Sequence, residues 1–209
     1  YNPYTISRYK FAGLDPQNGD PMGFANGEKT KDYYNITKNP ISEQVVSGQA
    51  IPPIFGALRN TFEWKNFLLT FHISYRFHYY VRKPSLNYSS FVNYGTYGYN
   101  LEKRWQFPGD EKITNVPSLV YPLQPQRDAF FQYSDINVIP ADNIKLTEVY
   151  SEYRFISSPS KFLQNLSFYL YLSNLNVMIW KKNKEGLDPD ILYNVKPPVS
   201  FSGGIKLNF

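Results

Sequence analysis

Residues 67–81 read FLLTFHISYRFHYYV, and their pattern is the strongest structural signal in the sequence. Every second residue from Phe67 to Val81 is apolar, and the residues between them are mostly polar or cationic. A period of two places the apolar side chains on one face of a β-strand and the polar side chains on the other. Soluble strands are commonly about 5–6 residues long, whereas a tilted strand needs about 9–11 residues to cross a bilayer. The stretch therefore predicts one membrane-spanning β-strand.

The composition of the chain favours strands over helices. Its 209 residues include 19 Tyr, 16 Phe and 3 Trp, and aromatic residues are enriched in strands. The sequence has no run of about 18 apolar residues, which excludes a helical membrane span. The absence of cysteine excludes a disulfide framework and thiol chemistry. The net charge of +5 is modest and the basic residues are scattered, so we expect no nucleic-acid partner.

The segment before residue 67 completes a hairpin. If Lys65 and Asn66 form a two-residue turn, the facing pairs are Trp64 with Phe67, Phe62 with Leu69, and Leu58 with Ile73. Facing residues point to the same side of a sheet, so the apolar faces of the two strands coincide. We expect the membrane-facing side chains to be Phe62, Trp64, Phe67, Leu69, Phe71 and Ile73. We expect the lumen-facing side chains to be His72, Arg76 and His78.

A second hairpin is predicted further along the chain. It runs over residues 144–155, turns at residues 157–160 and returns over residues 166–179. Alternation is poor in the first of these strands, to which we assign no clear facing. In the return strand the alternation changes phase at Asn174 and Asn176, which indicates a bulge or the exit of the strand from the bilayer.

Two more strands are predicted near the ends of the sequence. Residues 4–12 form a weakly alternating strand, and residues 201–209 form an amphipathic strand that ends on Phe209. The second of these resembles the C-terminal signal of bacterial outer-membrane barrels. The last strand of an ordinary sandwich is the alternative.

The segments between the predicted strands have very unequal lengths. Two turns are short, whereas residues 13–50, 83–143 and 181–198 are long and rich in Pro, Gly, Asn and Asp. Short periplasmic turns and longer extracellular loops are typical of outer-membrane barrels. Six strands cannot close a barrel, and an open edge in lipid leaves backbone groups unpaired at high cost. We therefore expect an all-β, transmembrane antiparallel β-barrel that is completed by strands before Tyr1 or on a separate chain.

Several motifs follow the order and spacing of a known family across nearly the whole chain. They are Gly13–Pro16 with Gly19–Pro21, Ile51–Pro53 before Gly56 and Asn60–Phe62, Arg104–Trp105 with Pro108–Asp110 and Val116–Pro117, Ala141–Asp142 before Ile144–Leu146, Asn174–Leu175, Gly186–Pro189 and Phe201–Phe209. The chain resembles the C-terminal part of SusC/RagA-like TonB-dependent transporters of Bacteroidetes. The resemblance implies that residues 1–209 are the last six or so strands of a barrel of about 22 strands with long extracellular loops, and that a plug lies upstream.

The same resemblance implies a function in the bacterial outer membrane. It implies import of oligosaccharides or peptides through a lipid-embedded barrel, with a SusD-like surface lipoprotein as a lid. The TonB complex would act through the part of the protein upstream of Tyr1. Two alternatives stay open. The barrel could be a structural subunit of a larger outer-membrane assembly, for secretion or barrel insertion, that moves no solute. The chain could also be a soluble carbohydrate-binding sandwich whose second sheet covers the aromatic face of residues 67–81.

Few residues point to chemistry. Arg104 and Trp105 lie in the longest loop, where a guanidinium beside an aromatic face suits substrate binding; loop packing is the alternative. His72 and His78 lack further His or Cys ligands, so no metal site is expected. Asp15–Asp20 lacks the glycine and the glutamate of a calcium loop and predicts a plain turn. No catalytic carboxylate pair, nucleophile elbow or phosphate loop stands out, so we expect neither an enzyme nor a cofactor.

Overall fold

A computed structural model describes residues 3–38, 40, 44–160 and 163–208. The chain folds into two compact units, and two separate segments contribute to each. Unit 1 contains Tyr1–Ile51 and Tyr80–Ile139, and unit 2 contains Pro52–Tyr79 and Pro140–Phe209. Among the described residues, we find no helix with the length and apolarity that a membrane crossing requires.

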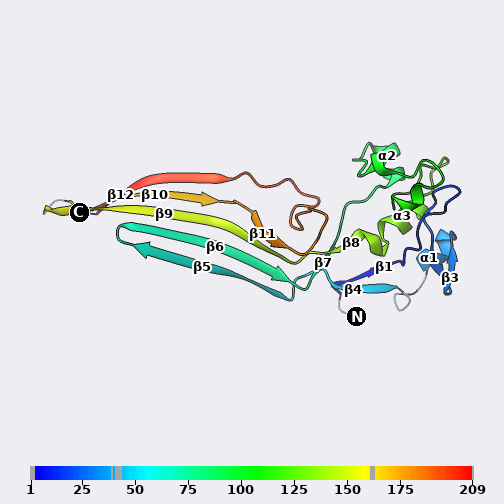
Figure 1. Cartoon of the computed structure of the whole chain (residues 1–209), viewed down its shortest axis with the longest axis horizontal. Helices are drawn as coiled ribbons and strands as arrows, with labels where there is room; N and C mark the ends of the chain where they lie inside the picture. Colours follow the sequence, from blue (N-terminus) through cyan, green and yellow to red (C-terminus); the bar gives the residue numbers. More distant parts are fainter. Residues whose placement is uncertain (1–2, 39, 41–43, 161–162, 209) are drawn as a thin grey trace. The chain divides into compact units, whose positions relative to one another are not determined.

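A single sheet makes up the regular structure described in unit 2 (Figure 1). Its strands are β5 (Ile54–Trp64), β6 (Phe67–Phe77), β9 (Asn143–Ser160), β10 (Leu163–Ser173), β11 (Val177–Lys181) and β12 (Ser200–Asn208). The strand order is β12-β10-β9-β6-β5, and β11 pairs with β9 beside this path. All of these pairs are antiparallel. The all-β antiparallel fold predicted from the sequence is confirmed.

The hairpin of β5 and β6 has the register that the sequence predicted. Trp64 faces Phe67, and the pairing continues without a break to Ile54 and Phe77. Lys65 in the two-residue turn adopts a left-handed conformation with φ of 53°, as the tight turns of hairpins require. The apolar residues of both strands therefore lie on one face of the sheet, as expected.

The end of β6 differs from the prediction of a single strand over residues 67–81. The strand stops at Phe77, because His78 adopts a left-handed conformation with φ of 61° that ends the extended backbone. The next three residues in strand geometry form β7 (Tyr80–Arg82), which pairs with β8 (Val138–Pro140). The prediction is therefore wrong beyond Phe77. The alternation of apolar and polar residues continues to Val81 in the sequence, although the extended backbone of β6 ends at Phe77.

A bulge in β9 explains the poor alternation of residues 144–155. His72 on β6 faces Glu148 and the next residue, Ile73, faces Leu146, so Thr147 has no partner in the register. The Thr147 hydroxyl donates to the His72 carbonyl at 3.0 Å. One extra residue shifts the side-chain period by one position. The charged residues of β9 consequently occupy an odd position before Thr147 (Lys145) and even positions after it (Glu148, Glu152 and Arg154).

The second hairpin also departs from its predicted bounds. β9 continues to Ser160, so the turn predicted at residues 157–160 is wrong, and the connecting residues 161–162 lie outside the described residues. The return strand is split into β10 and β11, because Asn174 and Asn176 both have positive φ. This break accounts for the predicted change of phase.

β11 and β12 end up beside different strands. β11 pairs with the beginning of β9, whereas β12 pairs with β10 along nine facing residues. Phe209, the predicted barrel signal, lies outside the described residues.

Unit 1 has a packed core of its own. Its elements, apart from β7 and β8, are β1 (Thr5–Arg8), β2 (Gly23–Ala25), β3 (Glu28–Thr30), α1 (Tyr33–Lys38), β4 (Val45–Gln49), α2 (Tyr88–Tyr94), α3 (Pro125–Gln132) and the 3-10 turns Leu101–Lys103, Asp110–Lys112 and Asp135–Asn137. Phe130 of α3 is fully buried against Ala25, Tyr33 and Ile36. The rings of Tyr33 and Phe130 stack with centroids 5.8 Å apart. Two of the long segments predicted as loops therefore contribute to a folded unit.

The strand predicted over residues 4–12 belongs to this unit and not to the large sheet. Only Thr5–Arg8 forms a strand there, and it pairs with β4 in a two-stranded sheet. The prediction of a barrel strand at this position is wrong. Its weak alternation carried no information about which strand would be its neighbour.

Candidate functional site: the polar face of the sheet

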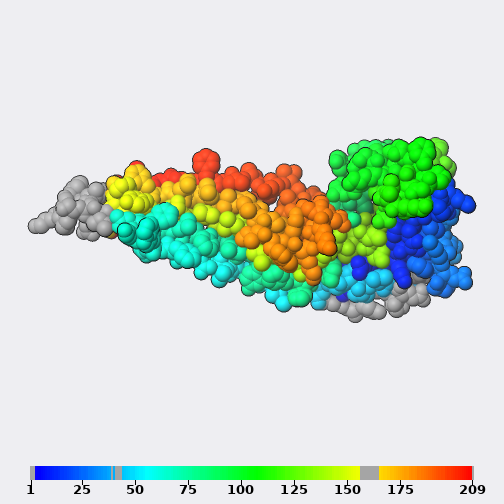
Figure 2. All heavy atoms as spheres, viewed as in Figure 1, coloured from blue at the N-terminus to red at the C-terminus, as the bar shows by residue number. Residues whose placement is uncertain are grey.

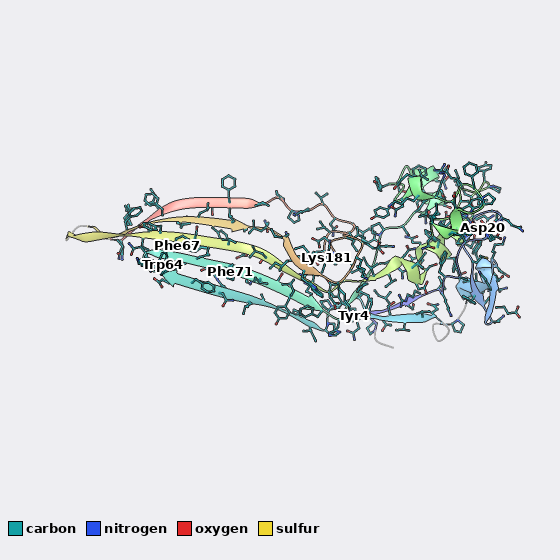
Figure 3. All side chains as sticks on the ribbon, in the orientation of Figure 1. Tyr4, Asp20, Trp64, Phe67, Phe71 and Lys181 are labelled. Atoms are coloured by element: carbon teal, nitrogen blue, oxygen red, sulfur yellow. The ribbon has the colours of Figure 1, made fainter. Side chains whose placement is uncertain are left out.

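The sheet of unit 2 has one apolar and one polar face. Phe62, Trp64, Phe67, Leu69, Phe71 and Ile73 share the apolar face, as predicted from their register. Figure 3 shows Trp64 and Phe67 beside the hairpin turn and Phe71 further along β6. Trp64 and Phe201 are 72% and 79% exposed, so no described residue covers this face at their positions. A contiguous apolar surface that is exposed in this way is typical of contact with a membrane or another protein.

The opposite face collects charged side chains near the β5–β6 turn. Glu152 is 8% exposed and accepts hydrogen bonds from Lys206 at 2.9 Å, from Arg154 at 3.3 Å and from the Tyr150 hydroxyl. Arg154 also donates to Glu63 at 2.7 Å. We call these five residues the hairpin-end cluster. It joins β5, β9 and β12, which are separated by other strands in the sheet.

A second charged group lies near the other end of the same face. Lys145 of β9 is 2% exposed, and its ammonium donates to Asp188 at 2.6 Å and to Asp190 at 2.5 Å. Arg76 of β6 forms an ion pair with Asp190. We call Arg76, Lys145, Asp188 and Asp190 the loop clamp. It holds the segment after β11 on the polar face, and Figure 2 shows the orange atoms of this part of the chain gathered over one end of the sheet.

The two histidines predicted to face the lumen have different positions. His72 lies on the polar face of β6, where its ring Nδ1 is 3.1 Å from the Thr147 hydroxyl. His78 adopts a left-handed conformation just beyond the end of β6, so its side chain does not continue the polar face of that strand. Arg76 is on the polar face and belongs to the loop clamp. Within the described part of the chain, no group of three or more His, Cys, Asp or Glu side chains could hold a metal ion.

Arg104 and Trp105, the predicted substrate-binding residues, lie in unit 1. Trp105 is 7% exposed, and its backbone N–H donates to the Val116 carbonyl at 2.9 Å. Its indole packs on Gly19 so closely that a Cβ there would be 2.4 Å from a ring atom. The Arg104 guanidinium donates to the Leu101 carbonyl in its own loop at 3.1 Å. This geometry fits the loop-packing alternative, and substrate contact stays a prediction.

The Asp15–Asp20 segment has the hydrogen bonds of a turn. The Asp15 carboxylate accepts from the Gln17 N–H at 2.8 Å and from Lys31 at 2.6 Å. The bond from Lys31, followed by that from Gln17, holds the pKa of Asp15 below its ordinary value. Asp20 pairs at 2.8 Å with Arg127, which is 2% exposed, and more distantly with Lys31 at 3.9 Å. These carboxylates serve the packing of unit 1.

Of the residues in the two charged groups, only Arg76 was predicted from the sequence to lie on the polar face. One available signal was the spacing of Glu152 and Arg154, which lie two apart on a predicted strand and therefore share a face. Lys206 likewise alternates with apolar residues near the end of the chain. No pattern indicated that Lys145 would meet Asp188 and Asp190.

Comparisons with known proteins give a structural likeness only. No family model and no curated protein matches the sequence. A solved structure of the RagAB peptide transporter is similar with a TM-score of 0.63 and 20% identity, over 98% of this chain and 22% of that chain. The RagAB peptide importer in its open-open state gives a TM-score of 0.64 and 19% identity, over 100% of this chain and 24% of that chain. The RagAB peptide importer in its closed-closed state gives a TM-score of 0.63 and 19% identity, over 97% of this chain and 23% of that chain.

This likeness concerns the fold. The chain spans between a fifth and a quarter of the length of the chains it matches. At this level of identity, the match shows that the present chain is folded like one part of those transporter structures.

Proposed function

We propose that this chain is the C-terminal part of a SusC/RagA-like transporter of the bacterial outer membrane, which imports peptides or oligosaccharides. The observation that carries the proposal is the division of one antiparallel sheet into an exposed aromatic face and a charged, internally paired face. A transmembrane barrel requires these two faces, one toward lipid and one toward a polar lumen. The fold likeness to the RagAB peptide transporter supports the same assignment.

The two edges of the sheet extend this argument. β5 and β12 are the edge strands, and each has a neighbour on one side only among the described residues. Backbone groups that are unpaired in lipid are costly, so a sheet in a membrane has to close on itself. We therefore propose that strands outside the described residues pair with both edges and complete the barrel.

The connections of the sheet support an orientation for it. Tyr1–Ile51 leads into the start of β5, and Tyr80–Ile139 connects the end of β6 to the start of β9. All three of these connections lie at the end of the sheet opposite the Lys65–Asn66 turn. Outer-membrane barrels have short turns on the periplasmic side and long connections outside the cell. We propose that unit 1 is extracellular, where it would contribute to the seat of a SusD-like lipoprotein, and that TonB energises import through the part of the protein upstream of this chain.

The membrane assignment can be tested with single cysteines, because the 209 residues contain none. Phe71 and its neighbour His72 are replaced in turn by cysteine in the full-length protein and labelled with an environment-sensitive fluorophore. Reconstituted with brominated lipid, the label at residue 71 should be quenched, and the label at residue 72 should respond to a water-soluble quencher. Equal quenching of the two labels by the aqueous reagent would contradict a membrane position.

Transport requires a separate test in cells that produce the protein. We expect uptake of fluorescent peptides or oligosaccharides to depend on the gene and to stop when a protonophore removes the energy source for TonB. A protein that passes the cysteine test but supports no uptake of either class would contradict transport. Such a result would favour the alternative of a structural subunit of an outer-membrane assembly.

A further inference from the structure

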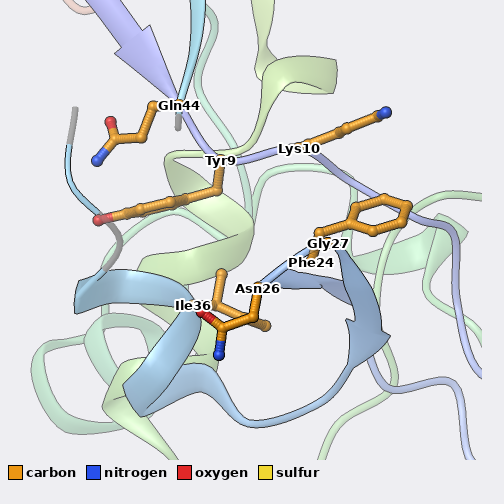
Figure 4. A pocket seen from close by; sticks show the side chains of 7 residues that line it. All are labelled: Tyr9, Lys10, Phe24, Asn26, Gly27, Ile36 and Gln44. Carbon is orange, nitrogen blue, oxygen red and sulfur yellow. The ribbon is translucent and has the colours of Figure 1, made fainter. Parts of the chain in front are cut away.

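Unit 1 contains a pocket that belongs to neither charged group on the sheet (Figure 4). Its volume is about 450 Å³, and it is lined by Tyr9, Lys10, Phe24, Asn26, Gly27, Ile36 and Gln44. Figure 4 shows the Tyr9 ring lying across the pocket from Ile36 and Asn26, with Lys10 and Phe24 on one side. Pockets of about 300–1,000 Å³ with apolar walls and a few polar groups commonly bind small molecules.

The apolar wall of the pocket is held in place by the core of unit 1. Ile36 is 1% exposed and belongs to the core cluster. The backbone of Tyr9 donates to the Tyr133 carbonyl at 3.1 Å and accepts from the Asp135 N–H at 2.9 Å. The Tyr9 hydroxyl donates to the Thr37 carbonyl at 3.3 Å. A wall fixed in this way loses little conformational freedom when a ligand binds.

The polar rim carries a positive charge. Lys10 places its ammonium 4.9 Å from the centre of the Phe24 ring, an arrangement that holds the charge beside the apolar wall. Asn26 adds a carboxamide group, which can donate and accept hydrogen bonds. Lys10 is the one side chain with a formal charge among the described residues that line the pocket. The rim therefore favours an anion beside an apolar group.

We infer that this pocket binds the C-terminal residue of a peptide with an apolar last side chain. That side chain would pack on Tyr9, Phe24 and Ile36, and its carboxylate would meet Lys10. The carboxamide of Asn26 matches the N–H and C=O of a peptide backbone. A carboxylate beside Lys10 would add a charge-assisted contact that a neutral sugar cannot make, which favours the peptide. The inference rests on the proposed function for the access of extracellular peptides to unit 1.

The first test varies the ligand. The detergent-solubilised full-length protein is titrated calorimetrically with an N-acetylated peptide of three alanines and a final leucine. Amidation of the terminal carboxylate should weaken binding about tenfold, because a charge-assisted contact is lost. Replacing the final leucine by glycine should also weaken binding, because the apolar wall stays uncovered. Equal affinity for the free acid and the amide, or tighter binding of a neutral oligosaccharide, would overturn the inference.

The second test varies the protein. Lys10→Met should weaken binding of the free-acid peptide about tenfold and abolish the preference for the acid over the amide. Lys112→Met removes an exposed lysine of unit 1 that does not line the pocket, and it should leave both affinities unchanged. If both variants act alike, general charge and not the pocket is responsible, and the inference fails. The ligand series gives the answer independently if Lys10→Met does not fold.

Failure of this inference differs from failure of the proposed function. Peptide binding that depends on Lys10, in a protein that supports no uptake, would retain the pocket and reject transport. Peptide uptake by cells, combined with binding that is insensitive to Lys10→Met and to amidation, would retain transport and reject the pocket.

Discussion

Lys145 is a buried cation between two carboxylates on the polar face of the sheet. Its side chain is 3% exposed, whereas those of Asp188 and Asp190 keep 18% and 30% of their surface in contact with solvent. Removing one partner of a buried ion pair is costly because the other partner stays desolvated. Arg76 also reaches Asp190, but its side chain is 42% exposed, and exposed pairs contribute little.

Replacement of Lys145 by methionine should therefore release the loop clamp. We expect a loss of about 3 kcal/mol of stability, near the lower end of the range for broken buried pairs because both carboxylates are partly solvated. Trypsin should cut more rapidly within residues 182–196. Arg76→Gln, the control, should cost no more than about 1 kcal/mol. Adding Asp188→Asn and Asp190→Asn to Lys145→Met should recover most of the loss, and a further loss would contradict this account.

The close packing of Trp105 on Gly19 can be tested by a single substitution. It has φ of +70°, and a Cβ at this position would lie 2.4 Å from the Trp105 ring. Gly19→Ala should cost about 2–4 kcal/mol, from the left-handed backbone and from overpacking together. Gly95→Ala is the control, because its φ of +62° is similar and no atom lies within 4 Å of the added Cβ. Chemical unfolding followed by tryptophan fluorescence measures both, and equal losses would show that the contact with Trp105 is unimportant.

At the scale of the element, β9 is the strand whose alternation depends on a bulge. Thr147 is the extra residue, and its carbonyl accepts a hydrogen bond from the Leu175 N–H at 3.1 Å, beside the break between β10 and β11. The bulge allows Lys145 and Glu152 to occupy the same face although they are seven positions apart. Both charged groups of the polar face depend on this shift.

Two single-residue deletions should separate the bulge from the rest of the strand. Deleting Thr147 makes Leu146 and Glu148 adjacent in the chain. These two residues already face the adjacent residues Ile73 and His72 of β6, so the register is kept and we expect the protein to fold. Deleting Tyr150 can be absorbed only by flattening the bulge, which would turn Glu148 to the apolar face and Val149 to the polar face. We expect that variant not to fold. Far-UV circular dichroism and protease resistance distinguish them, and comparable folding of both would contradict the register.

In the whole molecule, the two units differ in how their apolar side chains are covered. Unit 1 buries Phe130 and Ile36 in a core, whereas the sheet of unit 2 leaves its aromatic face exposed among the described residues. A sheet of this kind requires lipid or a partner on that face, and further strands at its edges.

Hydrogen exchange of the full-length protein in lipid nanodiscs tests the edges. We expect the amides of β5 and β12 to exchange as slowly as those of β6 and β10, because strands outside the described residues would pair with them. The short sheet of β1 and β4 in unit 1 provides a rapidly exchanging reference. Fast exchange at β5 and β12, with β6 and β10 protected, would show open edges and contradict the barrel.

The β5–β6 hairpin and the identity of its two faces could be predicted from the sequence. Adjacent strands joined by two residues have their register set locally, and alternation then assigns each side chain to a face. The choice of neighbours among distant strands could not be predicted from local sequence, because it depends on contacts between segments far apart in the chain. Arg76 and Asp190, 114 positions apart, meet only because β6 lies beside β9. His78 ends β6 through its positive φ although the alternation in the sequence continues to Val81, whereas the interruptions at Thr147 and Asn174 coincide with irregular alternation.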